Sequence, residues 1–311
     1  MRGDALGSAG PASSAARLAA TAIVPLAGFA AIGAAVAGGR GAVVGAVCAG
    51  VLLAAGYAYG DRLALSAMAA RPVGEVEHPE LYRLVRELSK TGRLPVPRLY
   101  LSPAEQPNAL AVGRGPRTAS VCCTQGLLSA LDEAELRGVL GHELAQVSGR
   151  DNLAATVSAG LATVITFPAG LARFLPGRAG VGPPGPGTSG SAAPRRPGSS
   201  GLGPLETSLM LVLGPVAALV IRLAVTRARA YRADAAGARL SGDPVALANA
   251  LRKVDAGTAE LALAPDGRLT SVGHLMIACP FRPDGFARLF LTHPPAGERI
   301  RRLEALAGYR R

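Results

Sequence analysis

The segment LDEAELRGVLGHELAQVSGRD, residues 131–151, decides how this chain folds. Asp132 followed by Glu135 three residues later is typical of a helix start, because each side chain can accept the other residue's backbone N–H. Apolar residues then recur at helical spacing, at Leu136, Val139, Leu140, Leu144 and Val147. The pattern predicts a capped helix that carries His142 and Glu143.

His142 and Glu143 fill the first two positions of an H-E-x-x-H pattern. In that pattern two histidines four residues apart share one helical face and hold a zinc ion, while the glutamate activates the metal-bound water. The second histidine position is Gln146 in this chain. The motif therefore predicts one imidazole ligand, a candidate general base in Glu143, and a weak neutral oxygen donor at Gln146.

Further helices and a few short strands are predicted around this helix. Spacing of apolar residues favours a helix over 75–92, with Leu81, Leu84, Val85 and Leu88 inward. Other helices are expected to begin at Asp243 and after Pro295, the last with Ile300, Leu303 and Leu306 inward. Short strands are expected over 98–102, 109–113 and 117–123. The fold class expected is α+β, mostly helical, with a small sheet.

Five separated blocks resemble the HtpX family of membrane zinc endopeptidases, which is related to the CAAX prenyl proteases. They are residues 107–116, 118–147, 226–251, 274–281 and 292–306, in the family's order and spacing. The likeness runs from about residue 76 to the C-terminus. It implies a gluzincin-type metallopeptidase domain with a small sheet, attached to transmembrane helices. It also likens strand 117–123 to the edge strand that holds an extended substrate backbone.

The resemblance implies a zinc ion held by both histidines of the motif and by a downstream glutamate in an E-x-x-x-D pattern. That glutamate position falls on Ala230, and the aspartate on Asp234, which is expected to orient His142. Gln146 and Ala230 thus stand at two of three ligand positions. His78, His274 and His293 lie outside the expected ligand set.

Three functions follow from this ligand set. The first is an HtpX-like homologue with a degraded zinc site, dead or impaired as a peptidase, which binds membrane or misfolded proteins or regulates a partner. The second is an active zinc-dependent membrane endopeptidase with nonstandard ligands and Glu143 as general base. The third is a structural membrane protein that retains the fold.

Composition indicates that part of the chain faces lipid. Of 311 residues, 49% are hydrophobic and only 17% are charged. Four windows are long and apolar enough to span a bilayer: 18–39, 41–60, 152–172 and 207–225. The first two are expected to form a hairpin at Arg40, with a secretory signal peptide as the alternative for 18–39. The last two could instead be buried helices.

These windows divide the chain. We expect an N-terminal tail over 1–17, a transmembrane hairpin over 18–60, and two halves of a peptidase-like domain over 61–151 and 226–311. Between the halves, 152–225 would contain two apolar helices joined by a disordered Pro/Gly/Ser loop, 176–204.

Charge and cysteine usage suggest where the domain lies. The net charge is +12, and arginines near segment ends favour a multi-pass cell-membrane protein whose peptidase-like domain faces the cytoplasm. Aromatic residues make up 4% of the chain and tryptophan is absent, so no nucleic-acid partner is expected. Cys48, Cys122, Cys123 and Cys279 have no C-x-x-C spacing and are expected to be reduced.

Overall fold

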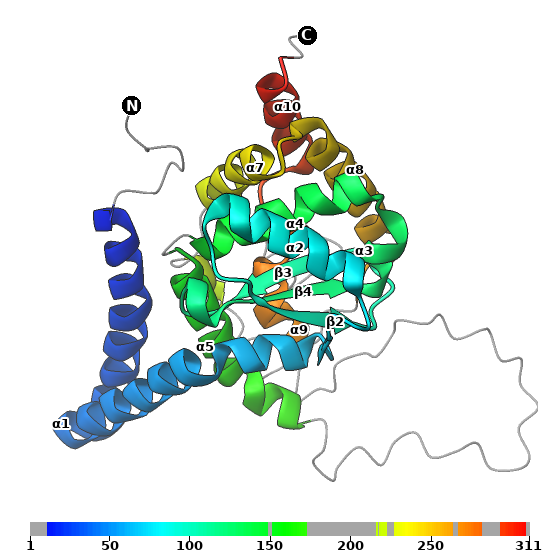
Figure 1. The fold of residues 1–311 in the computed structure, drawn as a ribbon. Coiled ribbons are helices and arrows are strands. Elements are labelled where there is room, and N and C mark those ends of the chain that lie inside the picture. Colours follow the sequence, from blue (N-terminus) through cyan, green and yellow to red (C-terminus); the bar gives the residue numbers. More distant parts are fainter. Residues whose placement is uncertain are drawn as a thin grey trace, which may run out of the picture.

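A small sheet between two layers of helices forms the centre of the protein (Figure 1). The structure is a computed structural model that describes residues 11–148, 151–172, 216, 218–222, 227–263, 267–281 and 293–308. The helices on one side of the sheet include α2 and α4, and α1 and α9 lie on the other. This agrees with the expected α+β class.

The described elements follow one another along the chain in this order. They are α1 (Pro11–Ala67), β1 (Arg71–Pro72), α2 (Pro79–Gly92), β2 (Arg98–Ser102), β3 (Ala109–Val112), the 3₁₀ turn η1 (Pro116–Thr118), β4 (Ser120–Thr124), α3 (Gln125–Ala130), α4 (Glu133–Ser148), α5 (Asp151–Ala172), α7 (Arg227–Ser241), α8 (Pro244–Glu260), α9 (Gly267–Val272), the 3₁₀ turn η2 (Gly273–Leu275) and α10 (Ala296–Leu306).

The sheet has the strand order β1-β2-β4-β3, with β2 and β4 parallel and the other pairs antiparallel. Side chains alternate along β4, so Cys123 faces the core beneath α2 and α4 while Cys122 faces the core beside α1 and α5. These two adjacent cysteines therefore point to opposite faces of the sheet. All four cysteines are free thiols.

The prediction of an edge strand over 117–123 is wrong in two respects, the first residue of the strand and its position in the sheet. Residues 116–118 form the turn η1, because Pro116 begins it, and the strand starts only at Ser120. β4 then lies between β2 and β3 with all five residues buried. An extended peptide cannot add to a strand whose two edges are already paired.

The predicted helix starts are largely as the sequence indicates. Asp132 and Glu135 each accept the other's backbone N–H, at 2.9 and 3.0 Å, so the capping box before α4 is confirmed. Asp243 caps α8 by accepting two backbone N–H groups at 2.9 Å. In α10 Leu303 is buried, but Leu306 is 57% exposed because the last turn points away from the fold (Figure 1).

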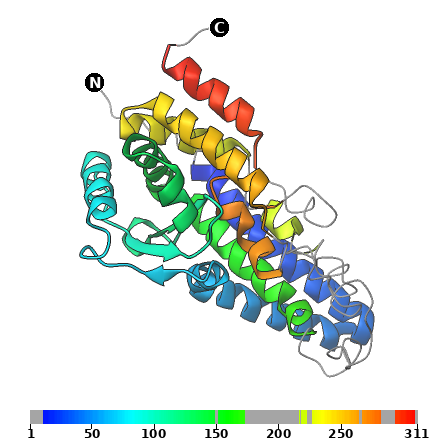
Figure 2. The ribbon, with the colours of Figure 1, turned by 90° about the vertical axis from the view of Figure 1, so that its right-hand side faces the viewer.

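The N-terminal apolar residues form two helices that fold back on each other (Figure 2). The turn falls at Ala37 and Gly38 rather than at Arg40, and Gly38 has the left-handed φ of +61°. Of the described residues, only Ala37–Ala67 forms a helix that is long and apolar enough to cross a membrane, and 11% of its apolar window is buried. Ala19–Ala35 is a shorter apolar helix.

The later apolar windows are only partly described. In α5 the side chains from Asn152 to Thr163 are buried, apart from the partly buried Leu153, and they pack against α1 and α9. Residues 218–222 are helical, with Val220 and Ile221 buried beside Leu161. The loop 176–204 lies outside the described residues.

Candidate functional site

Two helices bring the motif residues together through a contact of their backbones. Gly141 on α4 and Gly237 on α7 face each other, and a Cβ on Gly237 would lie 2.6 Å from the Cα and N of His142. Only glycine permits so close an approach at this crossing. The contact places Asp234, one turn before Gly237, beside the imidazole of His142.

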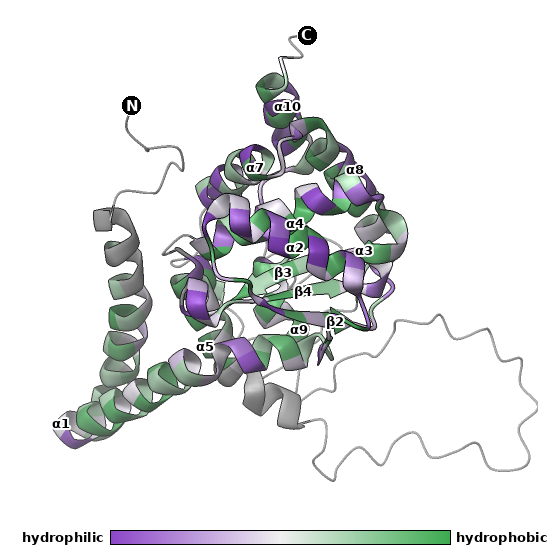
Figure 3. Ribbon diagram, in the orientation of Figure 1, coloured by the Kyte–Doolittle hydropathy of each residue, from purple (hydrophilic) through white to green (hydrophobic). Residues whose placement is uncertain are grey.

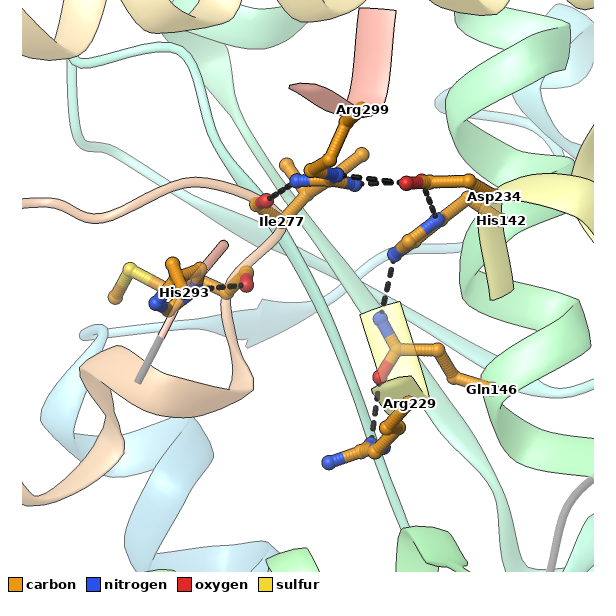
Figure 4. Close-up of polar contacts among 8 residues, drawn as sticks. His142, Gln146, Arg229, Asp234, Ile277, His293 and Arg299 are labelled. Carbon is orange, nitrogen blue, oxygen red and sulfur yellow. Dashed lines mark hydrogen bonds and ion pairs between the residues drawn. The ribbon is translucent and has the colours of Figure 1, made fainter. Parts of the chain in front are cut away.

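His142 is 1% exposed and its Nδ1 lies 2.8 Å from Oδ1 of Asp234 (Figure 4). Burial lowers the pKa of His142, and the neighbouring carboxylate offsets this only in part. The neutral ring therefore carries its proton on Nδ1, toward the carboxylate, and presents a lone pair at Nε2.

Asp234 keeps its negative charge inside the protein because Arg299 contacts it at two points. The guanidinium of Arg299 donates to Oδ2 at 2.8 Å and to Oδ1 at 2.7 Å, and a third N–H donates to the carbonyl of Ile277. Burial alone would raise the pKa of Asp234, but Arg299 and His142 together hold it well below its ordinary value. Asp234 thus orients His142 and is itself fixed by α10.

The lone pair of His142 is occupied by Gln146, one turn further along α4. The side-chain nitrogen of Gln146 lies 2.7 Å from Nε2 of His142 (Figure 4). Arg229 fixes which end of the amide faces the ring, since its guanidinium donates to the Gln146 carbonyl oxygen at 2.6 Å. It also donates to Oδ1 of Asn152 at 3.0 Å. A chain of polar contacts therefore runs from Arg299 through Asp234, His142 and Gln146 to Arg229.

Glu143 is fully buried, and neither carboxyl oxygen has a hydrogen-bond partner in the described part of the chain. Burial raises the pKa of Glu143 to about 8, although Arg229 and Arg299 partly offset that rise. At neutral pH this side chain is mostly the uncharged acid.

A model of peptidase family M48 matches residues 75–307, which is most of the chain. This chain belongs to peptidase family M48. Within that family it is similar to proteins named Protease HtpX homolog. The relative from Kineococcus radiotolerans is 51% identical, over 84% of this chain and 85% of its own length. Those from Paenarthrobacter aurescens and Aquifex aeolicus are 48% and 37% identical, over 81% and 89% of this chain and 81% and 88% of their own. No solved structure matches.

Membership of this metallopeptidase family implies a metal cofactor, typically zinc. The residues that this M48 chain places around His142 do not fit such an ion. Gln146 turns its amide N–H toward the imidazole nitrogen that would bind the metal, and its oxygen is held by a cation, Arg229. Ala230, half-buried on α7, offers a methyl group. Within the described ranges, no three His, Cys, Asp or Glu residues lie close enough to hold a metal ion.

The other histidines of this M48 domain lie apart from the His142–Gln146 contact. His293 lies 2.7 Å from the carbonyl of Met276 through Nε2 (Figure 4), and burial lowers its pKa to about 4. His274 is buried against Ala155 and Ser158 of α5, and burial lowers its pKa to about 3. His78 precedes α2 and is partly exposed.

Sequence reasoning missed the two arginines that complete the polar chain. Arg229 and Arg299 are 7% and 2% exposed, although arginine is usually a surface residue. One signal was available for Arg299: it stands next to Ile300 on a short helix whose inward side was already expected. Nothing in the sequence alone indicated that Arg229 would donate to Gln146.

Proposed function

We propose that this chain is a membrane-embedded M48 homologue that does not hydrolyse peptides and instead binds segments of membrane or misfolded proteins, or regulates a partner. The observation that carries the proposal is the contact between Gln146 and Nε2 of His142, with the amide held by Arg229. A catalytic zinc needs about three protein ligands and an open position for water. Here Nε2 of the single imidazole, His142, already accepts a hydrogen bond from the amide of Gln146.

The state of Glu143 follows from the same ligand set. A general base must be ionised and within reach of the water it activates. With no metal ion beside it, Glu143 is closed off from solvent and is mostly protonated at neutral pH, because burial raises its pKa to about 8. Water without a metal keeps a pKa near 16, so this carboxyl group has no activated water to deprotonate.

Membrane embedding is the second part of the proposal. The apolar helix Ala37–Ala67 exposes valines along the part that precedes the domain: Val43, Val44, Val47 and Val51 are 60–64% exposed. Such a stripe is suited to lipid and is unfavourable in water. We place the domain on the cytoplasmic side, because Arg62 lies near the domain end of this helix and Arg71 just after it, whereas Arg40 lies near the opposite end.

Metal content of the full chain purified in detergent tests the first part. We expect substoichiometric zinc in the natural chain and in His142→Ala alike. The double change Gln146→His with Ala230→Glu should raise zinc toward one ion per chain, since the helices that carry these positions are already in place. Stoichiometric zinc in the natural chain that is lost on His142→Ala would favour an active zinc endopeptidase and overturn the proposal.

Binding of an unfolded protein tests whether the chain holds protein segments without hydrolysing them. Fluorescein-labelled β-casein is a suitable probe because it has little stable structure. We expect the natural chain to bind it without producing fragments, at an affinity that added zinc does not change. Cleavage by the natural chain would refute the inactive assignment. No binding at all would leave only the structural role of a retained fold.

A further inference from the structure

An open pocket of about 610 Å³ lies where the membrane helix meets the domain. It is lined by Tyr57 of α1, Pro95, and the loop that leads into β4, with Arg114, Pro116, Arg117 and Thr118. We propose that this pocket binds the phosphate headgroup of an anionic phospholipid in the membrane that α1 crosses. The inference rests on the membrane embedding proposed above and is separate from the question of catalysis.

The length of the apolar stretch places Tyr57 at the membrane surface. Arg40 and Asp61 are the charged residues that bound this stretch, and they are 21 positions apart. At 1.5 Å per residue the helix between them spans roughly 31 Å, close to the thickness of a bilayer's hydrocarbon core. Tyr57 lies one turn inside Asp61, at the level where tyrosine is enriched in membrane proteins. In Figure 3 the ribbon of α1 is mostly green or pale after the bend, up to a purple turn close to the domain.

The pocket carries two positive charges beside that tyrosine. The guanidinium carbon of Arg114 lies 5.3 Å from the centre of the Tyr57 ring, a cation–π distance. Both Arg114 and Arg117 are exposed, and neither forms an ion pair with a carboxylate in the described part of the chain. Asp61 does not line the pocket. Two unpaired guanidinium groups at the membrane surface are suited to a phosphate that accepts several hydrogen bonds.

The loop that presents these arginines is fixed from both sides. Thr118 accepts the backbone N–H of Arg114 at 3.2 Å and donates to the carbonyl of Gly115 at 3.3 Å, which closes the loop. At its base Gly113 has φ +139°, and a Cβ there would lie 2.8 Å from the carbonyl of Thr118. Asn152 of α5 donates to the carbonyl of Gly113 at 3.1 Å. The backbone that carries the arginines is therefore held in place against α5 before any ligand binds.

A lipid fits the lining better than a free anion does. Pro95 and Pro116 supply apolar surface beside the charges, and the pocket opens next to the part of α1 that would face lipid. A phospholipid can keep its chains against α1 while its phosphate contacts the arginines. An inorganic phosphate would gain the charge contacts alone, against strong competition from water.

Native mass spectrometry of the full chain in detergent tests the proposal with defined lipids. We expect one dioleoyl-phosphatidylglycerol to be retained at concentrations where dioleoyl-phosphatidylcholine is not. The variant Arg114→Gln with Arg117→Gln should weaken retention by about 10- to 30-fold, since each juxtamembrane cation contributes about 1 kcal/mol. The control Lys90→Gln with Arg239→Gln removes the same charge from exposed positions on α2 and α7 and should change retention less than twofold.

Three outcomes would overturn the proposal. The natural chain could retain both lipids equally, the two double variants could weaken retention equally, or equimolar inorganic phosphate could displace the lipid. Circular dichroism should show that the Arg114→Gln, Arg117→Gln variant is folded. Resistance of the natural chain to carbonate extraction from membranes is measured separately, so that a failure of membrane embedding is distinguished from a failure of the lipid site.

Discussion

Replacing Glu143 by glutamine should change how stability depends on pH. The pKa of Glu143 is raised from 4.5 to about 8 in the folded protein because the carboxyl group is buried without a partner. The folded state therefore binds a proton that the unfolded state releases between these two pH values. Stability from this group is fully present below pH 4.5 and is lost as pH rises through 8. Glutamine cannot ionise, so Glu143→Gln should abolish this component.

The size of the effect follows from the shift. One pKa unit corresponds to about 1.4 kcal/mol, so a shift from 4.5 to about 8 corresponds to a loss on the order of 5 kcal/mol above pH 8, of which about 3 kcal/mol is already lost at pH 7. The buried amide of the variant costs stability of its own, but that cost does not vary with pH. The informative quantity is therefore the slope against pH rather than the stability at one pH.

Unfolding in mixed SDS micelles, followed by circular dichroism from pH 5 to 9, measures that slope. The natural chain should lose stability relative to Glu143→Gln across this range. The exposed Glu260→Gln should follow the natural chain, because its carboxyl group is already in water. Parallel curves for the natural chain and Glu143→Gln would show that Glu143 is ionised or solvated in the folded state, and the argument that it cannot act as a base would fail.

Other substitutions test the remaining contacts. Gly237→Ala should destabilise the fold by about 1–3 kcal/mol in the same unfolding assay, because the new Cβ would meet the backbone of His142. The control Gly297→Ala should be neutral or slightly stabilising, because the space around Gly297 is open. Arg299→Met should cost about 3–5 kcal/mol by leaving Asp234 buried and unpaired; a smaller loss would mean that water reaches that carboxylate. Burial lowers the pKa of His274 to about 3, so the stability that its neutral ring contributes is fully present above pH 6.5 and falls on acidification, by about 2 kcal/mol at pH 5. His274→Gln should therefore make stability depend less on pH below 6.5. An unchanged dependence would contradict the argument from burial.

Much of the fold could be predicted because local signals decide it. The capping box at Asp132, the proline-initiated helix after Asp243 and the apolar spacing of α2 each depend on residues within a few positions. The expectation failed for the strand near 117–123, where Pro116 favours a turn and where the place of a strand in a sheet depends on partners far away in the sequence. Strand order cannot be read from the strand itself.

The sequence identifies the residues of the candidate site but not the contacts that they make. A motif locates His142 and Glu143, and family resemblance points to Gln146, Ala230 and Asp234. The motif does not specify which way an amide turns or which cation holds it. The bond from Arg229 to Gln146 joins residues 83 positions apart, and it forms only because α4 and α7 cross at a pair of glycines.

Asn152 forms hydrogen bonds to two residues that are far apart in the sequence, Gly113 and Arg229. Its amide nitrogen donates to Gly113, at the base of the loop that carries Arg114 and Arg117, and its oxygen accepts from Arg229, which holds Gln146. The helix that carries it is packed along the hairpin. A tilt of the hairpin, such as a thinner bilayer imposes, must therefore either carry the amide of Gln146 with it or break one of these bonds. Through Asn152, the membrane embedding proposed above would couple the surrounding lipid to the position of the Gln146 amide.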